Sequence, residues 1–464
     1  MTITTNPNFD MGTVGFKSET LMEEAMKRRM FLLNSIVAGS LSSRTAPHAM
    51  ATNDRLRIGL MGCGGRCKQL LEGLLPRKDC EIVTLCDVDR SKFGPVVAMV
   101  ENTTGNVPDR VTDFRRMLDD PTLDAVVIAV NSHWHSLATI LACQAGKHVY
   151  VEKPFSQNIW EGRKVVEAAH KYQRVVQIGM QNRSHDYLYK AADFIRDGGL
   201  GQVHQVRVIN MLGWAGPFKP KNNRGVPEGL NYDIMCGPGP IVPWNGKWPL
   251  RHTWDFGPGN IWDNAIHQTD IARWITGLGA PKAAHCSGGV FAQKDGREIP
   301  DTFVATWEYD DVLFHLQASQ NAPYKSSSLG TGIGTTDEMP DWLFSGVSLE
   351  VYGTDGMMFC GRHGGGWTVH GPDGGLKRSV PGRHDTPAHI ANFIEAVRDG
   401  VQQNVTPEEA QISTVMAHMA NISYRLGGRR LEWDSANERF YNDSEANALL
   451  KRTYRNPWIV PDSV

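Results

Sequence analysis

Lys153 is the first side chain whose type and position could support chemistry. It lies in the segment Glu152-Lys153-Pro154, directly after an apolar run over residues 148–151 that predicts a buried strand. Proline restricts the residue before it to extended backbone conformations, so Lys153 leaves the strand in a defined direction. A lysine fixed in this way could hydrogen-bond a substrate hydroxyl. The simpler interpretation of a Glu-Lys pair at a strand end is a solvated terminus.

A second group of polar residues has helical spacing. Asp263, His267 and Asp270 fall at positions that share one face of a helix predicted over residues 262–276. A carboxylate beside an imidazole can orient the ring and raise its basicity, and histidine is well matched to proton transfer near neutral pH. We therefore predict that His267 accepts a proton and that Asp263 orients it or holds a neighbouring hydroxyl.

Two other interpretations of this group remain open. His267 could be a core histidine that is satisfied by Asp263 or Asp270. Two carboxylates and a histidine on one face could also bind a metal ion. The sequence has eight cysteines but no C-x-x-C pair, and it shows no further cluster of ligands. No metal site is predicted.

A glycine-rich turn follows the first apolar strand, over residues 56–61. The sequence there is GCGGRC, residues 62–67. The first glycine allows a tight turn, the second lets a pyrophosphate approach the backbone, and the N-terminus of the next helix favours the anion. The third position is usually Gly or Ala but here is Cys67, which weakens the motif. The predicted dinucleotide contacts of this turn are Gly62, Gly64, Gly65 and Arg66.

Asp87 ends the next apolar strand, over residues 81–86. Its distance from the glycines suits a carboxylate that accepts hydrogen bonds from a ribose 2′-hydroxyl. Because a carboxylate there would repel a 2′-phosphate, the predicted cofactor is NAD rather than NADP. Arg90 could still offer a partner to such a phosphate, and Asp87 could instead cap a helix.

Alternating strand and helix patterns must position these residues. Five short apolar runs alternate with amphipathic stretches between residues 56 and 178, which is typical of βαβ units and a parallel sheet. We predict a doubly wound Rossmann domain over residues 54–178. Lys153, and Asn131 after the run over residues 125–130, then lie at carboxyl ends of strands, where such sheets bind ligands.

Residues 179–464 are predicted to form an α+β domain with a largely antiparallel sheet. Strand patterns over 302–309 and 312–317 are separated by Asp310-Asp311, a hairpin signal. Thr406-Pro407 begins a helix, where Glu409 could complete a capping box. Six of the 13 tryptophans lie between Trp214 and Trp274. As a group they favour a carbohydrate-sized pocket, although packing is the simpler role for any one of them.

Residues 1–51 are predicted to be an export signal and leader. Arg28-Arg29 precedes an apolar stretch, Met30–Leu41, and Ala49-Met50-Ala51 offers a cleavage site. The pattern resembles a twin-arginine signal, so we expect a periplasmic protein, or a cytoplasmic one if the signal does not function. A disordered basic N-terminus is the alternative, and Met26 could be the true start. The stretch is shorter than the ~20 residues that a membrane span needs.

The overall composition argues against several classes of partner. The chain of 464 residues carries 48 Lys and Arg against 50 Asp and Glu, a net charge of −2. There is no basic excess for nucleic acid or for an anionic membrane. We predict no nucleic-acid partner, no stable membrane insertion and a small-molecule substrate.

Taken together, the motifs resemble those of the Gfo/Idh/MocA oxidoreductases, which include glucose–fructose oxidoreductase and inositol dehydrogenase. The resemblance rests on the glycine-rich turn, Glu152-Lys153-Pro154 and Asp263-x-x-x-His267-x-x-Asp270, in that order, and runs from about Leu56 to the C-terminus. The segments Leu431–Asp434 and Tyr454–Trp458 resemble exported bacterial members. The fold predicted above is the fold that this resemblance implies.

The resemblance also implies roles for individual residues. Lys153 would contact both nicotinamide and substrate, and His267 and Asp263 would face it from the second domain. Further cofactor contacts would come from the loop beside the nicotinamide ribose and from the crossing between the domains. The loop residues are Asn131, Ser132 and His135, and the crossing residues are Gln181, Asn182 and Arg183; Glu152 of the Glu-Lys-Pro motif is a further predicted cofactor contact. Family members often pair their second-domain sheets, so a homo-oligomer, dimer or tetramer, is expected.

The prediction that follows is an NAD-dependent oxidoreductase that transfers a hydride between a sugar or cyclic-polyol carbon and nicotinamide. One alternative is a glycoside hydrolase that oxidises its sugar transiently and returns the hydride from bound cofactor. Another is a non-catalytic sugar or nucleotide sensor on the same fold. The presence of Lys153, Asp263 and His267 argues against the sensor.

Overall fold

The computed structural model describes residues 55–213, 225–244, 252–325 and 345–464. The predicted export leader, residues 1–51, and two of the tryptophans, Trp214 and Trp248, lie outside these ranges. None of the described helices is both long enough and apolar enough to cross a membrane.

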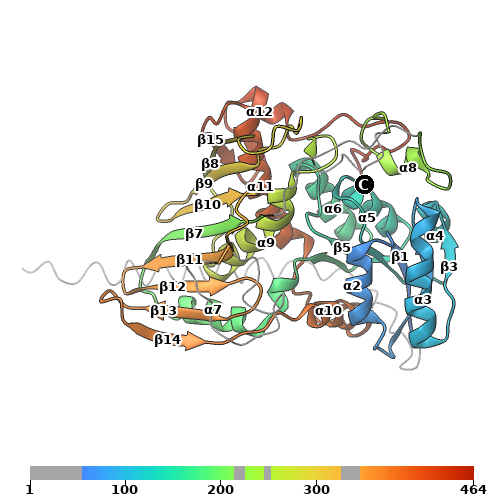
Figure 1. Ribbon diagram of the computed structural model, residues 1–464, viewed down its shortest axis with the longest axis horizontal. Helices are drawn as coiled ribbons and strands as arrows, with labels where there is room; N and C mark the ends of the chain where they lie inside the picture. Colours follow the sequence, from blue (N-terminus) through green and yellow to red (C-terminus); the bar gives the residue numbers. More distant parts are fainter. Residues whose placement is uncertain (1–54, 214–224, 245–251, 326–344) are drawn as a thin grey trace, which may run out of the picture. The chain divides into compact units, whose positions relative to one another are not determined.

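The first sheet has six parallel strands in the order β3-β2-β1-β4-β5-β6 (Figure 1). This is the doubly wound Rossmann order, which reverses direction between β1 and β4. The strands are β1 (Leu56–Met61), β2 (Cys80–Cys86), β3 (Asp109–Val111), β4 (Ala125–Ile128), β5 (His148–Glu152) and β6 (Val176–Gly179). The helices between them are α2 (Gly65–Leu74), α3 (Phe93–Thr104), α4 (Phe114–Leu118), α5 (His135–Gln144) and α6 (Ile159–Lys171). Every residue of β4 is buried, as expected for a central strand that is covered on both faces.

The second sheet has ten strands in the order β14-β13-β12-β11-β7-β10-β9-β8-β15-β16. Among the described strands of this sheet, β7 and β10 are the one parallel pair, so the predicted, largely antiparallel sheet is confirmed. The predicted hairpin joins β9 to β10. The strands are β7 (Val203–Met211), β8 (Ala283–Gly289), β9 (Thr302–Glu308), β10 (Leu313–Ser319), β11 (Val347–Gly353), β12 (Gly356–Gly361), β13 (Trp367–His370), β14 (Leu376–Val380), β15 (Leu431–Asp434) and β16 (Arg439–Phe440).

Six further α-helices follow β6 in the described part of the chain. They are α7 (Asp186–Arg196), α8 (Tyr232–Cys236), α9 (Asn260–Ile275), α10 (Thr386–Asp399), α11 (Pro407–Arg425) and α12 (Ser444–Ala448). Helix α10 returns to the first sheet and lies beside α2 (Figure 1), where Gly73 leaves room for Ile390. The chain after residue 385 therefore covers both sheets, and a single boundary at residue 178 separates the sheets but not the helices around them.

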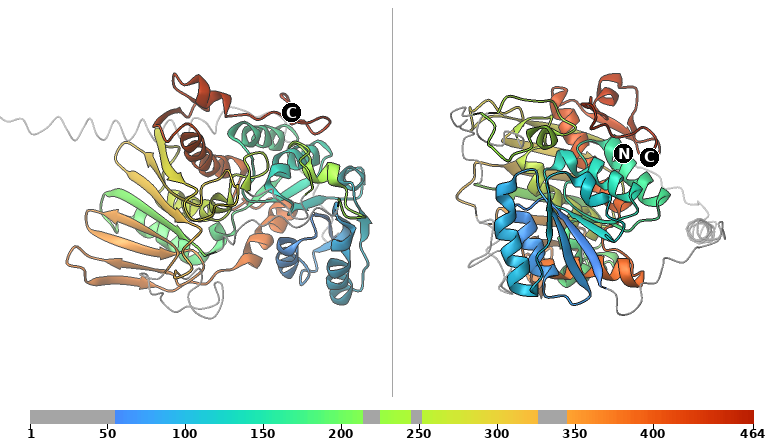
Figure 2. Two further views of the ribbon diagram at one scale, coloured as in Figure 1. Left: turned by 45° about the horizontal axis from the view of Figure 1, so that its top comes forward. Right: turned by 90° about the vertical axis from the view of Figure 1, so that its right-hand side faces the viewer.

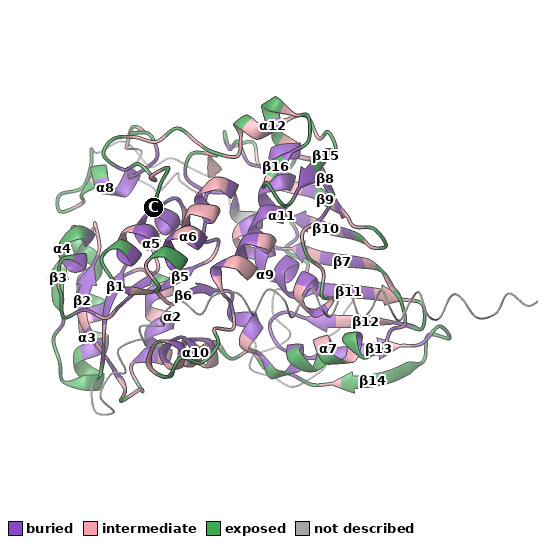
Figure 3. Ribbon diagram, turned by 180° about the vertical axis from the view of Figure 1, so that it is seen from behind, coloured by how far each residue is buried: buried purple, intermediate pink, exposed green. Residues whose placement is uncertain are grey.

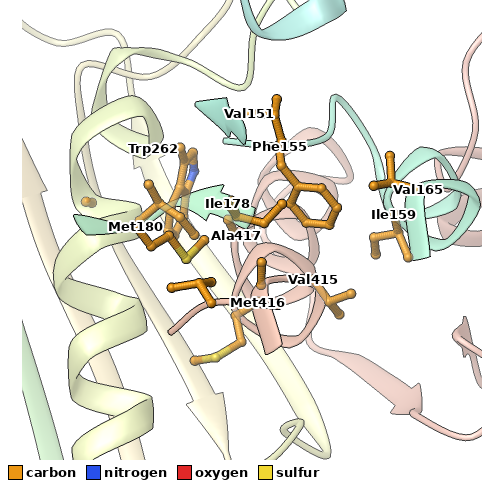
Figure 4. Close-up of a cluster of buried hydrophobic side chains, with 14 of the residues drawn as sticks. Val151, Phe155, Ile159, Val165, Ile178, Met180, Trp262, Val415, Met416 and Ala417 are labelled. Carbon is orange, nitrogen blue, oxygen red and sulfur yellow. The ribbon is translucent and has the colours of Figure 1, made fainter. Parts of the chain in front are cut away.

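Helix α11 lies at the seam between the two sheets. Its residues Val415 and Met416 pack near Val151 and Ile178 of the first sheet and near Trp262 of α9 (Figure 4). Buried residues are concentrated in these central elements (Figure 3), and α9 and α11 lie on one side of the ten-stranded sheet (Figure 2). This shared apolar core fixes α9, and with it the predicted catalytic histidine, against the carboxyl ends of β5 and β6.

The N-terminus of α11 differs in one detail from the prediction. The Thr406 hydroxyl accepts a hydrogen bond from the Glu409 N–H at 3.4 Å, as an N-cap should. The predicted reciprocal bond of a capping box is wrong. The Glu409 carboxylate instead accepts hydrogen bonds from Arg273 and Arg183, because two buried guanidinium groups next to it need counter-charges.

Candidate functional site

Two pockets adjoin at the carboxyl edge of the parallel sheet. They share Ala129, Val130 and Asn131, the residues that follow β4. One pocket lies over β1 and β2, and the other reaches β5 and the start of α9. This is the place where open α/β sheets bind ligands, next to the point where the strand order reverses.

The glycine-rich turn has the shape that a pyrophosphate requires. Gly62 has φ of 93°, and a Cβ there would lie 2.6 Å from the Ala129 carbonyl oxygen, so this position needs glycine. A Cβ at Gly64 or Gly65 would meet no atom within 4 Å. Helix α2 begins at Gly65 without a side-chain cap, which leaves its first amides available to an anion. Cys67, the unusual third residue, is buried. These residues fit a dinucleotide.

Asp87 is held by the backbone of the same turn. Its two carboxylate oxygens accept hydrogen bonds from the N–H groups of Cys63, at 2.7 Å, and Asp89, at 2.9 Å. The carboxylate still has acceptor sites for ribose hydroxyls. Asp87 lines the pocket that lies over β1 and β2. Burial raises the pKa of Asp87. The residue that caps the following short helix is Asp89, whose side chain accepts from the Ser91 N–H, rather than Asp87.

Replacing Asp87 by alanine is expected to weaken NAD binding about 10- to 100-fold, since hydrogen bonds to a charged group contribute ~1.5–3 kcal/mol. NADP binding should fall less, because the variant also loses the charge that repels a 2′-phosphate. Fluorescence titrations with both reduced cofactors would measure this. Asp89→Ala is the matched control and should leave the preference for NAD in place. An unchanged ratio of the two dissociation constants in Asp87→Ala would contradict the assignment.

Seven of the predicted site residues line the second pocket. Its lining includes Phe256, Gly257, Pro258 and Gly259, which directly precede α9. These four residues were not predicted from the sequence, because no motif marks them. The predicted residues in the lining are Arg66, Asn131, Ser132, His135, Glu152, Lys153 and Asp263.

Lys153 links the two halves of the second pocket. Its Nζ atom donates a hydrogen bond to Asp263 Oδ1 at 2.8 Å and another to the Asp263 carbonyl oxygen. The lysine follows β5, and Asp263 lies in the first turn of α9. Asp263 therefore holds Lys153 and not His267, which corrects the predicted orienting role. The reason is that a hydrogen bond from an ammonium group to a carboxylate joins two charged groups and is therefore strong.

His267 is buried, with 5% of its surface exposed, and its Nδ1 atom has no hydrogen-bond partner in the described part of the chain. Burial lowers the pKa of His267 well below 6.5, and the positive charges of Arg362 and Lys153 lower it further. The imidazole is therefore neutral at physiological pH and able to accept a proton. Because neither carboxylate bonds to it, the alternative of a core histidine satisfied by Asp263 or Asp270 is not supported.

Asp270 belongs to a separate buried ion-pair network. Its two oxygens accept hydrogen bonds from Arg183 Nε, at 2.8 Å, and Nη2, at 2.7 Å, and one of them also accepts from Ser413. Arg183 and Arg273 share the Glu409 carboxylate. The guanidinium of Arg183, predicted to contact cofactor, thus joins α9 to α11. This arrangement favours a structural role for both Arg183 and Asp270.

Asp270→Asn is expected to destabilise the fold by ~3 kcal/mol or more, because it leaves a buried guanidinium without its full counter-charge. Urea unfolding would measure the loss. The matched control is Asp193→Asn, which breaks an exposed pair with Arg196 and should change stability by less than ~1 kcal/mol. Equal stability of the two variants would contradict the network's role.

Hydrogen bonds hold Glu152 and His135 of this lining, and Gln181 beside them, in place. Glu152 Oε1 accepts hydrogen bonds from Arg66 Nε, at 2.7 Å, and Gln181 Nε2, at 2.8 Å. The ring nitrogens of His135 lie within hydrogen-bond distance of the Pro154 and Val130 carbonyl oxygens. Glu152 and Gln181 thus position Arg66, and His135 ties the ends of β4 and β5 together.

The tryptophans in the described residues do not form the expected sugar pocket. Four of the six lie in described residues, and none of these four lines the pocket that contains Lys153. Each instead packs on an aromatic ring. The pairs are Trp244 with Tyr232, Trp254 with Tyr424, Trp262 with Phe303 and Trp274 with Tyr189. In the described ranges, no group of three or more His, Cys, Asp or Glu side chains is placed to hold a metal ion.

The fold and site define a class of protein: a dinucleotide-binding Rossmann domain joined to a mixed sheet that supplies the other half of the pocket. Residues 56–180 match the model of the oxidoreductase family with an NAD-binding Rossmann fold, residues 237–359 match the GFO/IDH/MocA C-terminal domain, and residues 365–460 match the oxidoreductase family C-terminal alpha/beta domain. The chain belongs to the Gfo/Idh/MocA family of oxidoreductases, and its first domain binds NAD.

The relatives of this chain are named for more than one kind of activity. A myo-inositol 2-dehydrogenase of Thermotoga maritima is 25% identical over 79% of this chain and 96% of its own length. A glycosyl hydrolase family 109 protein of Solibacter usitatus is 24% identical over 54% of this chain and 60% of its own length. Another, of Stenotrophomonas maltophilia, is 34% identical over 28% of this chain and 30% of its own length. The chain thus spans less than two thirds of either hydrolase relative.

Solved structures share the fold. The WlbA dehydrogenase from Bordetella pertussis, in complex with NADH and UDP-GlcNAcA, has a TM-score of 0.60 at 20% identity and covers 82% of this chain and 99% of that one. The aldose-aldose oxidoreductase from Caulobacter crescentus, complexed with glycerol, has a TM-score of 0.58 at 18% identity, over 82% and 99%.

Proposed function

We propose that this protein transfers a hydride between a sugar or cyclic-polyol carbon and NAD. One observation carries the proposal. The ammonium of Lys153, from the first domain, is anchored to α9 of the second, and the neutral imidazole of His267 lies on the same helix. The pocket that contains Lys153 shares three residues with the pocket over the glycine-rich turn, so a substrate and a dinucleotide can meet at this junction.

The chemistry assigns one task to each residue. When bound, NAD supplies the acceptor for a hydride. Lys153 donates a hydrogen bond to the reacting oxygen and stabilises the negative charge that develops on it. His267 takes the hydroxyl proton as the carbonyl forms, and in the reverse direction returns it. Asp263 holds the ammonium of Lys153 in place at the pocket.

The rate of sugar oxidation is expected to have an acid limb well below pH 6.5. The base must be neutral to accept a proton, so activity falls only as the pH drops through the pKa of His267, and burial together with Arg362 and Lys153 lowers that pKa. The measurement is kcat/KM against pH, which reports the free enzyme. An acid limb above 6.5 would contradict His267 as the base.

A second candidate function is glycoside hydrolysis with NAD as a bound catalyst. It is favoured by the relatives named as glycosyl hydrolase family 109 proteins. The same Lys153 and His267 would serve, since a sugar carbon is oxidised and then reduced again. A panel of glycosides distinguishes the two functions when NADH and released aglycone are followed together. Accumulating NADH supports the dehydrogenase, and aglycone release without NADH supports the hydrolase.

We also propose that the chain is exported by the twin-arginine route and pairs into a homo-oligomer. Arg28-Arg29 and the apolar stretch after it support export, and Arg28→Lys combined with Arg29→Lys should keep the protein in the cytoplasm.

The proposed homo-oligomer rests on the second sheet. Two exposed apolar residues of that sheet, Val304 and Leu313, support pairing through it. Light scattering after size exclusion would measure the mass, and a monomer would exclude the pairing.

A further inference from the structure

Arg362 is a buried arginine without an ion-pair partner among the described residues. It directly follows β12 and is 7% exposed. Its Nη1 atom donates to Asn264 Oδ1 at 2.5 Å, but its Nε atom has no partner. The other three buried arginines of the described ranges, Arg183, Arg273 and Arg297, all form ion pairs with carboxylates. A buried charge that is left unpaired is strongly unfavourable, so its presence requires a reason.

The position of Arg362 is fixed from several sides. Its carbonyl oxygen accepts hydrogen bonds from Asn182 Nδ2, at 2.7 Å, and from the Tyr187 hydroxyl, at 3.2 Å. Its guanidinium bonds to Asn264, which directly follows the Asp263 that holds Lys153. Of all nearby charges, that of Arg362 has the largest effect on His267. Arg362 thus lies beside Lys153 and His267, the proposed catalytic pair.

Three histidines lie around Arg362, and two of them have a ring nitrogen without a hydrogen-bond partner in the described residues. The rings of His185 and His384 lie 4.5 Å apart, and those of His363 and His384 lie 5.8 Å apart. His185 Nε2 and His363 Nδ1 are buried without a partner. Burial and the charge of Arg362 lower the pKa of His363 and His384, so these rings are neutral near pH 7. These rings add hydrogen-bonding groups to the site. The carboxylate that acts on the charge of Arg362 is that of Asp263, which Lys153 already holds.

We propose that Arg362 binds an anionic group of the substrate, and therefore that the sugar is acidic, bearing a carboxylate or a phosphate. The planar guanidinium fork matches both groups, and a buried site strengthens the pairing. The carbon that reacts at Lys153 and His267 and the carbon that carries the anion belong to one molecule. This inference rests on the proposed function, because it places the anion next to that catalytic pair.

Equilibrium binding to the NAD-loaded protein tests the inference without turnover. The probes are glucose, glucuronate and glucose 6-phosphate, titrated by calorimetry. We expect at least one acidic sugar to bind 10-fold or more tightly than glucose. A preference for glucuronate assigns a carboxylate, and a preference for glucose 6-phosphate assigns a phosphate. If neither acid is preferred over glucose, the proposal is overturned.

Variants then attribute the preference to Arg362. Arg362→Gln should abolish it while the dissociation constant of NAD stays unchanged, and Arg207→Gln, which removes an arginine paired with Glu350, should keep it. Unchanged preference in Arg362→Gln overturns the proposal. If that variant does not fold, Arg362→Lys decides, since it retains charge without the fork and should reduce the preference. If the protein binds acidic sugars preferentially but transfers no hydride, the proposed function is wrong and the assignment of Arg362 stands.

Discussion

Replacing Lys153 by methionine is expected to lower kcat/KM for sugar oxidation about 1,000-fold, which corresponds to ~4 kcal/mol of transition-state stabilisation. Methionine keeps most of the side-chain volume but removes the ammonium that holds Asp263 across the two domains. The loss should fall mainly on kcat, because the negative charge on the reacting oxygen develops in the transition state. Steady-state kinetics at saturating NAD would measure it.

A matched control separates this effect from lost stability. Lys164→Met removes a lysine of similar burial that pairs with Glu167 on the surface of α6, and it should retain full activity. Lys153→Met should bind NAD as well as the unchanged protein does in a fluorescence titration. Turnover within a few fold of the unchanged protein would rule out the assigned role of Lys153.

Replacing His267 by alanine is expected to lower kcat/KM by about 100- to 10,000-fold, the range for loss of a general base. The remaining rate should lose its acid limb, since the group that titrates has gone. Added imidazole should restore part of the rate if the cavity left by the ring admits it. A structural histidine would not give this rescue. His418→Ala is the control, because His418 is buried equally well against the Ser156 carbonyl oxygen.

The pH profile provides a second, independent check on His267. The positive charge of Arg362 contributes to the low pKa of His267. The acid limb of the Arg362→Gln variant should therefore lie at higher pH than that of the unchanged protein. Coincident profiles in the two proteins would mean that another group sets the limb.

The sequence predicted the sheets and the location of the site because those depend on local pattern. Apolar runs with little polar interruption, such as Ala125–Ile128, are required wherever a parallel strand is covered on both faces. The turn at Gly62 is likewise a local requirement, since any side chain there would clash with the Ala129 carbonyl oxygen. Residues at the carboxyl ends of such strands then lie together by topology alone.

Partners across the fold could not be predicted in the same way. Spacing placed Asp263 and Asp270 near His267 on α9, but spacing does not say which element packs on each side of a helix. Asp263 lines the pocket and accepts a hydrogen bond from Lys153, whereas Asp270 is buried and accepts hydrogen bonds from Arg183. Arg362 lies 98 residues from Asn264 along the chain, and no motif connects the two.

The central claim is that hydride leaves a sugar carbon for NAD in this site. The most direct measurement is a single-turnover reaction of NAD-loaded protein with a panel of neutral and acidic sugars and glycosides that carry deuterium at each ring carbon in turn. We predict that reduced nicotinamide forms within the first turnover, that deuterium at one carbon slows its formation, and that Lys153→Met abolishes it. Binding of a sugar from the panel with no reduced cofactor at any time would contradict the account.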